Sequence, residues 1–374
     1  MRSLVSLDDD KEDETKSVFL WWRSAKEFDL EGHLKIDNVS NLTSRVKVLR
    51  EMERLAFVSA ESLDELRHKL LSYRAGDFWL PTGGIKKEEI DIPPTITVLL
   101  VGFSGSGKSS LINLMYSVLG RAGLIPFAQT SVNSLGPRTM YLEEHNVLRS
   151  TRSGFCLYDS RGLDYQNKKE SFAGVTDWLE DGVQHRYLCS RASDMVLEPP
   201  PLLSASRFVK RRVNCPLVVA NVAEIYQALL AGDTKPLEAT RELFYLPALR
   251  NCDENPLLVL THGDSLSTEE RVEGRVKICQ FLGISETTGA YDIACITENG
   301  FLAEDLDPVT AYTVTEAIYR ALIISDRTHL PKKDYKDTLL LWLSVLMFAF
   351  SAFFACLSDC FSKLGSKGSN KLKK

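Results

Sequence analysis

One glycine-rich segment limits the possible folds of this chain more than any other feature does. Residues 102–109 read Gly-Phe-Ser-Gly-Ser-Gly-Lys-Ser, which is the spacing Gly-x-x-x-x-Gly-Lys-Ser. An apolar, strand-like run over 96–101 comes directly before it, and a helical pattern over 110–119 follows it. A phosphate-binding loop needs this context, because its amide N–H groups and the helix N-terminus together attract an anion. The segment therefore predicts an α/β domain that binds a nucleoside triphosphate with Mg²⁺.

Two side chains of this loop have defined expected roles. Lys108 is expected to bridge the β- and γ-phosphates and to take part in catalysis, and the Ser109 hydroxyl is expected to ligate Mg²⁺. The glycines let the backbone fold around phosphate oxygens. The predicted phosphate contacts are Gly102, Phe103, Ser104, Gly105, Ser106, Gly107, Lys108, Ser109 and Ser110.

An Asp-x-x-Gly motif ends a later apolar strand. Asp159 follows the run Phe-Cys-Leu-Tyr, and Gly162 comes three residues after it. An aspartate at the carboxyl end of a strand in such a sheet lies beside the phosphate loop, where it can hold Mg²⁺ through water. The backbone N–H of Gly162 is expected to contact the γ-phosphate during catalysis. The motif is common by itself, and its position downstream of the loop is what makes it informative.

A third apolar strand, residues 257–261, ends in Thr261-His262-Gly263-Asp264. Guanine differs from adenine in its N1–H and N2 amino donors, and one carboxylate can accept hydrogen bonds from both. Asp264 is expected to do so, with Thr261 and His262 completing the nucleotide-binding loop. A plain turn at the end of the strand is the alternative interpretation.

Short apolar runs alternate with helical patterns from residue 95 onward. This alternation predicts a P-loop NTPase fold of the G-domain kind, in which flanking helices cover a mostly parallel sheet. Helices are predicted to begin near Lys108, Pro236, Thr268 and Pro308. The predicted strands are 96–101, 139–144, 154–158, 216–222, 257–261 and 291–296.

Changes in composition predict how the rest of the chain is divided. Acidic residues dominate the start, apolar positions at helical spacing follow, and prolines and glycines cluster just before the P-loop domain. The predicted parts are an acidic flexible segment (1–16), a helical N-terminal region (17–80), a linker (81–94), the P-loop domain (95–328), a second linker (329–338), a transmembrane anchor (339–360) and a basic tail (361–374).

The uncharged stretch 339–357 is long and apolar enough to cross a bilayer, which takes about 20 residues as a helix. Lysines flank it on both sides and can reach lipid headgroups. Its place near the C-terminus predicts a single-pass tail anchor with the globular part in the cytosol. The plastid outer membrane, the mitochondrial outer membrane and the endoplasmic reticulum all remain open as destinations.

Composition limits the choice of partners. Hydrophobic residues make up 44% of the chain and charged residues 25%, and the formal net charge is −5. A weakly acidic chain gives no reason to expect nucleic acid as a partner. The insertion 186–213 carries a basic cluster, Arg207, Lys210, Arg211 and Arg212. It is interpreted either as a solvated surface loop or as a binding element.

The three motifs, in this order, resemble those of GTPases of the translation-factor-like class. Residues 102–114 and 259–264 look most similar to the septin-related group, which includes the plastid outer-envelope import receptors and the immune-associated nucleotide-binding GTPases. The resemblance covers about 95–325. It implies a switch threonine that ligates Mg²⁺ and acts in catalysis, for which Thr139 is the candidate and Thr130 the fallback, and base-edge contacts near Thr297.

The resemblance also bears on mechanism. Many of these GTPases place a water-orienting glutamine after Asp-x-x-Gly, but this chain has Leu163. We therefore expect slow hydrolysis that an activating protein or nucleotide-dependent pairing of two domains accelerates. Arg161 is interpreted as a charge-stabilising group in such a pairing or as a surface arginine.

Three functions stay open. The first is a membrane-anchored, GTP-binding switch or receptor with weak GTPase activity. The second is a P-loop ATPase, because His262 stands where GTPases usually have lysine. The third is a GTP-stabilised scaffold with negligible hydrolysis.

Overall fold

The structure is a computed structural model that describes residues 43–81, 84–119, 128, 139–148, 154–191, 208–250, 255–293, 308–332 and 335–369. Thr130, Arg207 and Thr297 lie outside these ranges. The chain divides into two compact units, of which the first comprises 1–80 with 92–328 and the second 81–91 with 329–374.

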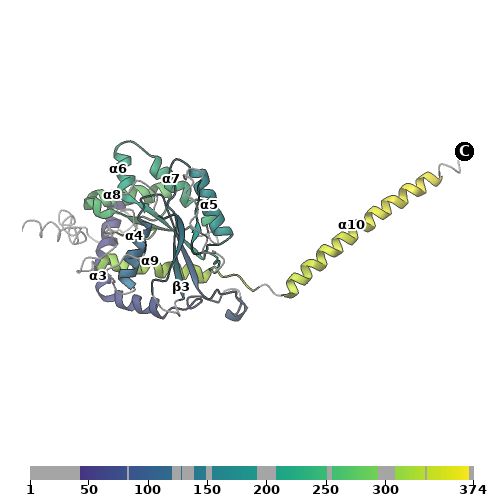
Figure 1. Cartoon of the computed structure of the whole chain (residues 1–374), viewed down its shortest axis with the longest axis horizontal. Helices are drawn as coiled ribbons and strands as arrows, with labels where there is room; N and C mark the ends of the chain where they lie inside the picture. Colours follow the sequence, from purple (N-terminus) through teal and green to yellow (C-terminus); the bar gives the residue numbers. More distant parts are fainter. Residues whose placement is uncertain are drawn as a thin grey trace, which may run out of the picture. The chain divides into compact units, whose positions relative to one another are not determined.

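A mostly parallel sheet forms the centre of the first unit (Figure 1). In the described part of the chain it has seven strands in the order β4-β2-β3-β1-β5-β6-β7. Strand β1 pairs in parallel with β3 and β5, whereas β2 pairs antiparallel with β3 and β4. The predicted fold class is thus confirmed. The strands are β1 (Ile96–Val101), β2 (Tyr141–His145), β3 (Phe155–Asp159), β4 (Tyr187–Leu188), β5 (Cys215–Asn221), β6 (Leu257–Thr261) and β7 (Ala290–Asp292).

Helices cover both faces of this sheet, because its central strands are apolar on both sides. All six residues of β1 are buried. Val98 and Leu100 pack with α3 (Ser44–Ser72), α4 (Lys108–Leu119) and α9 (Pro308–Arg327). Leu99 and Val101 pack on the opposite face. The helices of that face are α5 (Lys168–Glu180), α6 (Val222–Leu230), α7 (Lys235–Phe244) and α8 (Thr268–Leu282).

Helix α3 packs along α9, and one buried carboxylate fastens the chain that follows α3. Asp326 near the end of α9 is fully buried. Its carboxylate accepts hydrogen bonds of 2.9 Å each from the Tyr73 hydroxyl and from the backbone N–H groups of Gly76 and Phe78. The described end of the N-terminal helical region therefore belongs to the same packed unit as the sheet.

Several element bounds differ from the sequence-based prediction. Val222 was predicted in a strand but opens α6, because the Asn221 side chain accepts from the Glu224 N–H and caps the helix. Residues 139–140 precede β2 instead of belonging to it. Strand β7 ends at Asp292, and 294–296 lie outside the described residues. Helix α5 and the two-residue strand β4 were not predicted at all.

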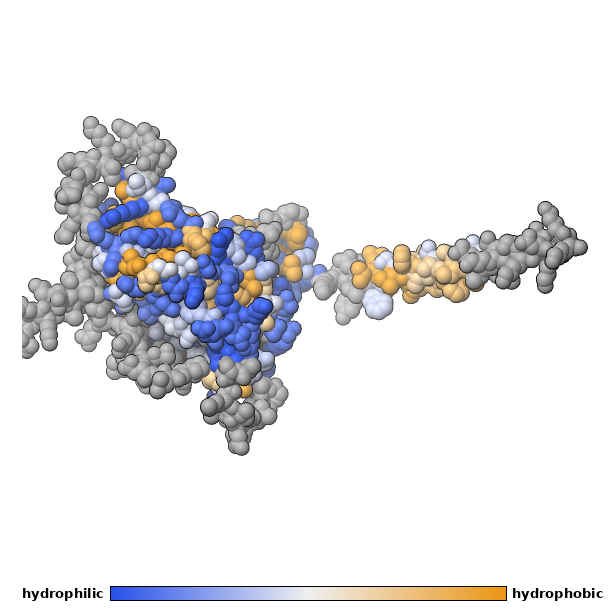
Figure 2. Space-filling view, turned by 90° about the horizontal axis from the view of Figure 1, so that it is seen from above, coloured by the Kyte–Doolittle hydropathy of each residue, from blue (hydrophilic) through white to orange (hydrophobic). Residues whose placement is uncertain are grey.

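The second unit holds the short helix η3 (Lys87–Glu89), an isolated antiparallel bridge between Ile90 and Pro331, and a long helix. Asp91 N–H donates to Leu330 O at 2.9 Å, and Lys332 N–H donates to Glu89 O at 2.7 Å. Helix α10 runs over Tyr335–Ser369. Within the described residues, one helix is long and apolar enough to cross a membrane, at Leu339–Ser358, and its side chains are exposed. Figure 2 shows these apolar side chains along α10.

Candidate functional site

The predicted phosphate loop connects the end of β1 to the start of α4. Strand β1 ends at Val101 and α4 begins at Lys108. Gly107 has a φ of 82°, a left-handed conformation that favours glycine. The neighbours of β1 are β3 on one side and β5 on the other, so the loop lies where the strand order reverses. Open α/β sheets bind their ligands at the carboxyl ends of the strands at this point.

Lys108 lies inside the loop with its ammonium surrounded by neutral oxygens. Its side chain is 6% exposed. Nζ donates to Gly102 O at 2.9 Å, to Phe103 O at 3.1 Å and to Ser106 Oγ at 3.3 Å. Burial lowers the pKa of Lys108 to about 8, an effect that nearby Asp159 opposes and that the charge of Arg191 reinforces. A buried cation held in this way is well placed to meet an anion.

Ser109, Asp159 and Thr139 bring oxygens together next to Lys108. Ser109 Oγ donates to Asp159 Oδ2 at 2.5 Å and lies 3.4 Å from Thr139 Oγ1. Asp159 is 1% exposed, and burial raises the pKa of its carboxyl to about 6, against the effects of Ser109 and Lys108. The structure thus places the three predicted metal ligands at one point. Ser110 is half-buried beside them on the first turn of α4.

These oxygens fit Mg²⁺. The second carboxylate oxygen of Asp159, Oδ1, is buried without a hydrogen-bond partner among the described residues. Such an atom needs an unseen water or ion to satisfy it. Mg²⁺ is held by one or two carboxylates together with water and substrate phosphates, so no larger acidic cluster is needed. None occurs in the described part of the chain.

The Asp-x-x-Gly segment is docked on the phosphate loop through main-chain atoms. Leu163 N–H donates to Gly102 O, and Ser104 N–H donates to Leu163 O, both at 2.9 Å. A Cβ on Gly162 would lie 2.7 Å from Ser104 Cα, so glycine is required there. The rings of Phe103 and Tyr165 stack at 4.2 Å. The Leu163 side chain is fully buried and so neither reaches nor orients a water molecule.

Two arginines lie next to Gly162: Arg161, which does not match its sequence-based interpretation, and Arg191, for which the sequence offers none. Arg161 is 2% exposed and donates from Nη1 to Cys189 O at 2.6 Å. It is therefore neither a surface residue nor one that points toward a partner. Arg191 donates from Nη2 to Gly162 O at 2.5 Å. No motif singled out Arg191, because only the fold brings the start of the 186–213 insertion to this segment.

The predicted base loop lies at the end of β6 and contacts the phosphate loop. Thr261 is fully buried, and its hydroxyl donates to Ser106 O at 2.8 Å. His262 adopts a left-handed φ of 60°, and burial lowers the pKa of its imidazole, which keeps it neutral. Asp264 follows in the short helix η6 (Gly263–Ser265) with an exposed side chain. Its carboxylate is thus available to a ligand.

The basic cluster of the insertion separates into two kinds of residue. Arg211 forms an ion pair with Glu144 at 3.3 Å, so the solvated interpretation is wrong for this residue. Lys210 and Arg212 are exposed, as a solvated surface predicts.

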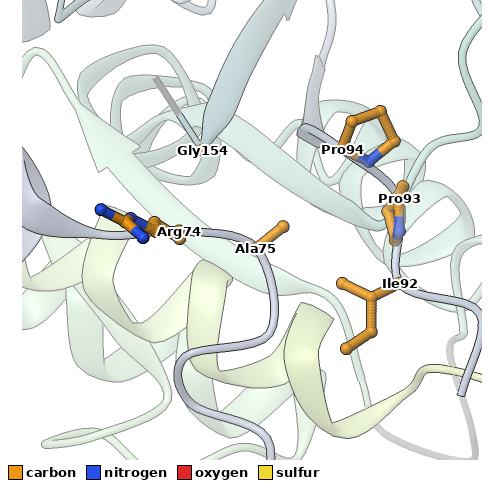
Figure 3. Close-up of a pocket in the computed structure, with 6 residues that line it drawn as sticks. All are labelled: Arg74, Ala75, Ile92, Pro93, Pro94 and Gly154. Atoms are coloured by element: carbon orange, nitrogen blue, oxygen red, sulfur yellow. The ribbon is translucent and has the colours of Figure 1, made fainter. Parts of the chain in front are cut away.

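A cavity of about 510 Å³ lies at the opposite edge of the sheet (Figure 3). Ile96 N–H donates to Gly154 O there, at the amino ends of β1 and β3. Of the side chains that line the cavity, one is charged, and no predicted site residue is among them. The lining residues are Arg74, Ala75, Ile92, Pro93, Pro94 and Gly154.

Comparison with known proteins gives distant structural similarities. No protein-family model matches the sequence, and a comparison with curated proteins found no match. A dimerization-deficient variant of Toc33 from Arabidopsis thaliana is 17% identical, covering 74% of this chain and 96% of that chain with a TM-score of 0.32. Toc33 from Arabidopsis thaliana in complex with GDP and Mg²⁺ is 17% identical with the same coverage and a TM-score of 0.27.

The signal recognition particle receptor SRb-GTP/SRX complex from Chaetomium thermophilum is 14% identical. It covers 60% of this chain and 99% of that chain with a TM-score of 0.31. Similarities this distant carry no weight for function, which has to be argued from the residues of this chain. Its own strand order, the loop between β1 and α4, and Asp159 at the end of β3 identify it as a P-loop protein with a G-domain-like fold.

Proposed function

We propose that this chain is a membrane-anchored GTP-binding protein with weak GTPase activity, which acts as a nucleotide-controlled switch or receptor on the cytosolic face of a membrane. Two observations together carry the proposal: the Lys108 ammonium is held by oxygens of the loop after β1, and the oxygens of Ser109, Asp159 and Thr139 cluster beside that loop. Mg²⁺ would add positive charge at the phosphates there. The chain's own residues would hold the phosphates and fix the position of that ion.

Phosphate binding is tested most directly at Lys108. Replacing Lys108 with alanine removes the buried cation and its two expected charge-assisted contacts, one to the β-phosphate and one to the γ-phosphate. Each such contact is worth about 1.5–3 kcal/mol. We expect the Kd for GTP to rise about 100-fold or more in calorimetry of the full chain in detergent. Lys169→Ala, an exposed lysine on α5, is the matched control. Unchanged affinity in Lys108→Ala contradicts the proposal.

Selectivity for guanine rests on Asp264. Its exposed carboxylate can accept from both N1–H and N2–H of guanine, whereas adenine offers no such pair. Asp264→Asn is expected to weaken GTP binding and to strengthen binding of xanthosine triphosphate, whose 2-oxo group accepts from the asparagine amide. Competition of labelled GTP with each nucleotide measures this. If ATP competes as well as GTP in the wild type, the ATPase alternative replaces this proposal.

Slow hydrolysis follows from the burial of Leu163. With no side chain available at this position to orient a water molecule, most of the usual positioning is missing. Single-turnover hydrolysis measured against protein concentration separates the possibilities. Fast turnover independent of concentration contradicts slow hydrolysis, and acceleration with concentration supports a nucleotide-dependent dimer. Acceleration only by added cell extract supports an activating protein, and binding without any turnover supports the GTP-stabilised scaffold.

Anchoring rests on the exposed apolar stretch Leu339–Ser358 of α10. A helix that is apolar all round has no polar face to present to water. A fluorescent fusion of residues 325–374 is expected to reach one membrane, which distinguishes the plastid and mitochondrial outer membranes from the endoplasmic reticulum. The same fusion with Leu346→Arg and Phe350→Arg is expected to stay soluble, since charges at mid-membrane oppose insertion.

A further inference from the structure

The short segment after β4 is fastened to both chain segments that surround the phosphate site. Cys189 N–H donates to Met140 O at 2.9 Å, directly beside Thr139. Cys189 O accepts from the buried Arg161, which belongs to the Asp-x-x-Gly motif. Cys189 is thus held in place by two independent contacts. Arg191 follows two residues later and makes its own contact with the Asp-x-x-Gly segment.

The Arg191 guanidinium reaches the phosphate loop through Gly162. Nη2 donates to Gly162 O at 2.5 Å. Gly162 itself packs so closely on Ser104 that even a methyl group would not fit. The Gly162 N–H is expected to contact the γ-phosphate, so the Arg191 guanidinium at Gly162 O lies beside the position expected for that phosphate. A guanidinium there can pair with phosphate oxygens.

We propose that Arg191 is a charge-stabilising catalytic residue supplied in cis, whose guanidinium contacts the γ-phosphate oxygens when GTP is bound. This inference rests on the proposed function, because it requires GTP at the loop. In hydrolysis a water oxygen bonds to the γ-phosphorus while the bond from that phosphorus to the β,γ-bridging oxygen breaks. The electron pair of the broken bond stays on the β-phosphate oxygen of GDP, and both protons of the water end on the inorganic phosphate, released as H₂PO₄⁻.

An arginine in this position complements the missing water-orienting side chain. Charge accumulates on the oxygens of the transferring phosphoryl group, and a guanidinium can contact two of them at once. The buried Leu163 side chain does not position the attacking water. Hydrolysis would therefore be slow but independent of an arginine from a partner, and a partner would have to supply water positioning instead.

The test uses the full chain in detergent with Arg191→Ala, Arg191→Lys and the exposed control Arg212→Ala. In single-turnover GTP hydrolysis we expect the rate constant of Arg191→Ala to fall about 10³-fold or more, with the GDP affinity changed less than about twofold. We expect Arg191→Lys to stay close to the alanine variant, because lysine can donate to Gly162 O but cannot span two phosphate oxygens. Arg212→Ala should behave as wild type.

A second readout does not depend on turnover. GDP with aluminium fluoride mimics the transition state. Without any partner protein, the wild type should bind GDP with aluminium fluoride more tightly than it binds GDP by itself. Arg191→Ala should bind the two with about equal affinity. Full activity in Arg191→Ala, rescue by Arg191→Lys, or no aluminium fluoride effect in the wild type overturns the role of Arg191 while leaving GTP binding intact. Absence of GTP binding in the wild type overturns both proposals.

Discussion

The Ser109 hydroxyl donates to a carboxylate oxygen of Asp159 at 2.5 Å and so joins the first turn of α4 to the end of β3. This contact places a hydroxyl and a carboxylate side by side at the carboxyl edge of the sheet. It also satisfies one of the two Asp159 oxygens. The other oxygen is left for water or metal.

Ser109→Ala and Asp159→Asn are expected to weaken Mg²⁺-dependent GTP binding about 10- to 100-fold each, the usual effect of removing a group that supports a metal. The measurement is GTP affinity titrated against Mg²⁺ and again after EDTA. Asp177→Asn, an exposed carboxylate on α5, is the control. Equal Mg²⁺ dependence in Asp159→Asn and the wild type would remove Asp159 from the metal site.

Gly162→Ala is expected to push the Asp-x-x-Gly segment away from the phosphate loop, because the new Cβ would lie 2.7 Å from Ser104 Cα. GDP affinity should change little, whereas the preference for GTP and its hydrolysis should fall. The ratio of GTP to GDP affinity measures this effect. Gly174→Ala on α5 serves as the control, since its nearest neighbour would be 3.9 Å away. An unchanged ratio in Gly162→Ala would show that the close packing of Gly162 on Ser104 does not contribute to the preference for GTP.

Asp326→Ala is expected to destabilise the first unit by about 3 kcal/mol or more, because three donors from the chain after α3 lose their shared acceptor. For a domain of this size, thermal unfolding should begin on the order of 10 °C lower. Asp64→Ala, whose side chain is 87% exposed, should leave the unfolding temperature nearly unchanged. A similar small effect in both variants would show that α3 is held by apolar packing alone.

The buried His145 should make the protein less stable to unfolding in acid. Burial, with help from the nearby charge of His185 and against that of Glu144, lowers the pKa of His145 to about 4. The unfolded chain takes up the proton near its ordinary pKa of about 6.5, before the folded chain does. This part of the stability is therefore complete above about pH 6.5 and is lost as the pH falls toward 4.

The loss through His145 should amount to about 3 kcal/mol over that range. Urea unfolding at several pH values measures it. His145→Gln should make the dependence shallower between pH 4 and 6.5, whereas the exposed His68→Gln should not. An identical slope in His145→Gln and the wild type would show that the imidazole is not held neutral.

The parts of the fold that sequence could predict are those with clear boundaries. Ile96–Val101 and Leu257–Thr261 match the prediction residue for residue, because each is an apolar run bounded by polar or glycine-rich sequence. Asn221 ends β5 and caps α6 at once. No turn residue separates the two elements, so periodicity alone extended the strand into Val222. Strand β4 is too short to show a pattern of its own.

The candidate site, like the fold, contains residues whose positions the sequence predicts and residues whose positions it does not. The motif residues Lys108, Ser109 and Asp159 are brought together as their spacing predicts, since each follows or ends a strand of one parallel sheet. Arg191 depends on the path of the chain through β4, and Arg161 is buried because Cys189 accepts its hydrogen bond. Neither contact leaves a local signal in the sequence. Tertiary context alone determines them.

The main-chain pairing of Leu163 with the phosphate loop has a consequence for evolution. The two hydrogen bonds come from peptide groups, so they impose no choice of side chain at position 163 beyond an apolar one that fills the core. Position 162 has no such freedom. Among descendants of the same ancestor, residue 162 should stay fixed while residue 163 drifts among aliphatic types.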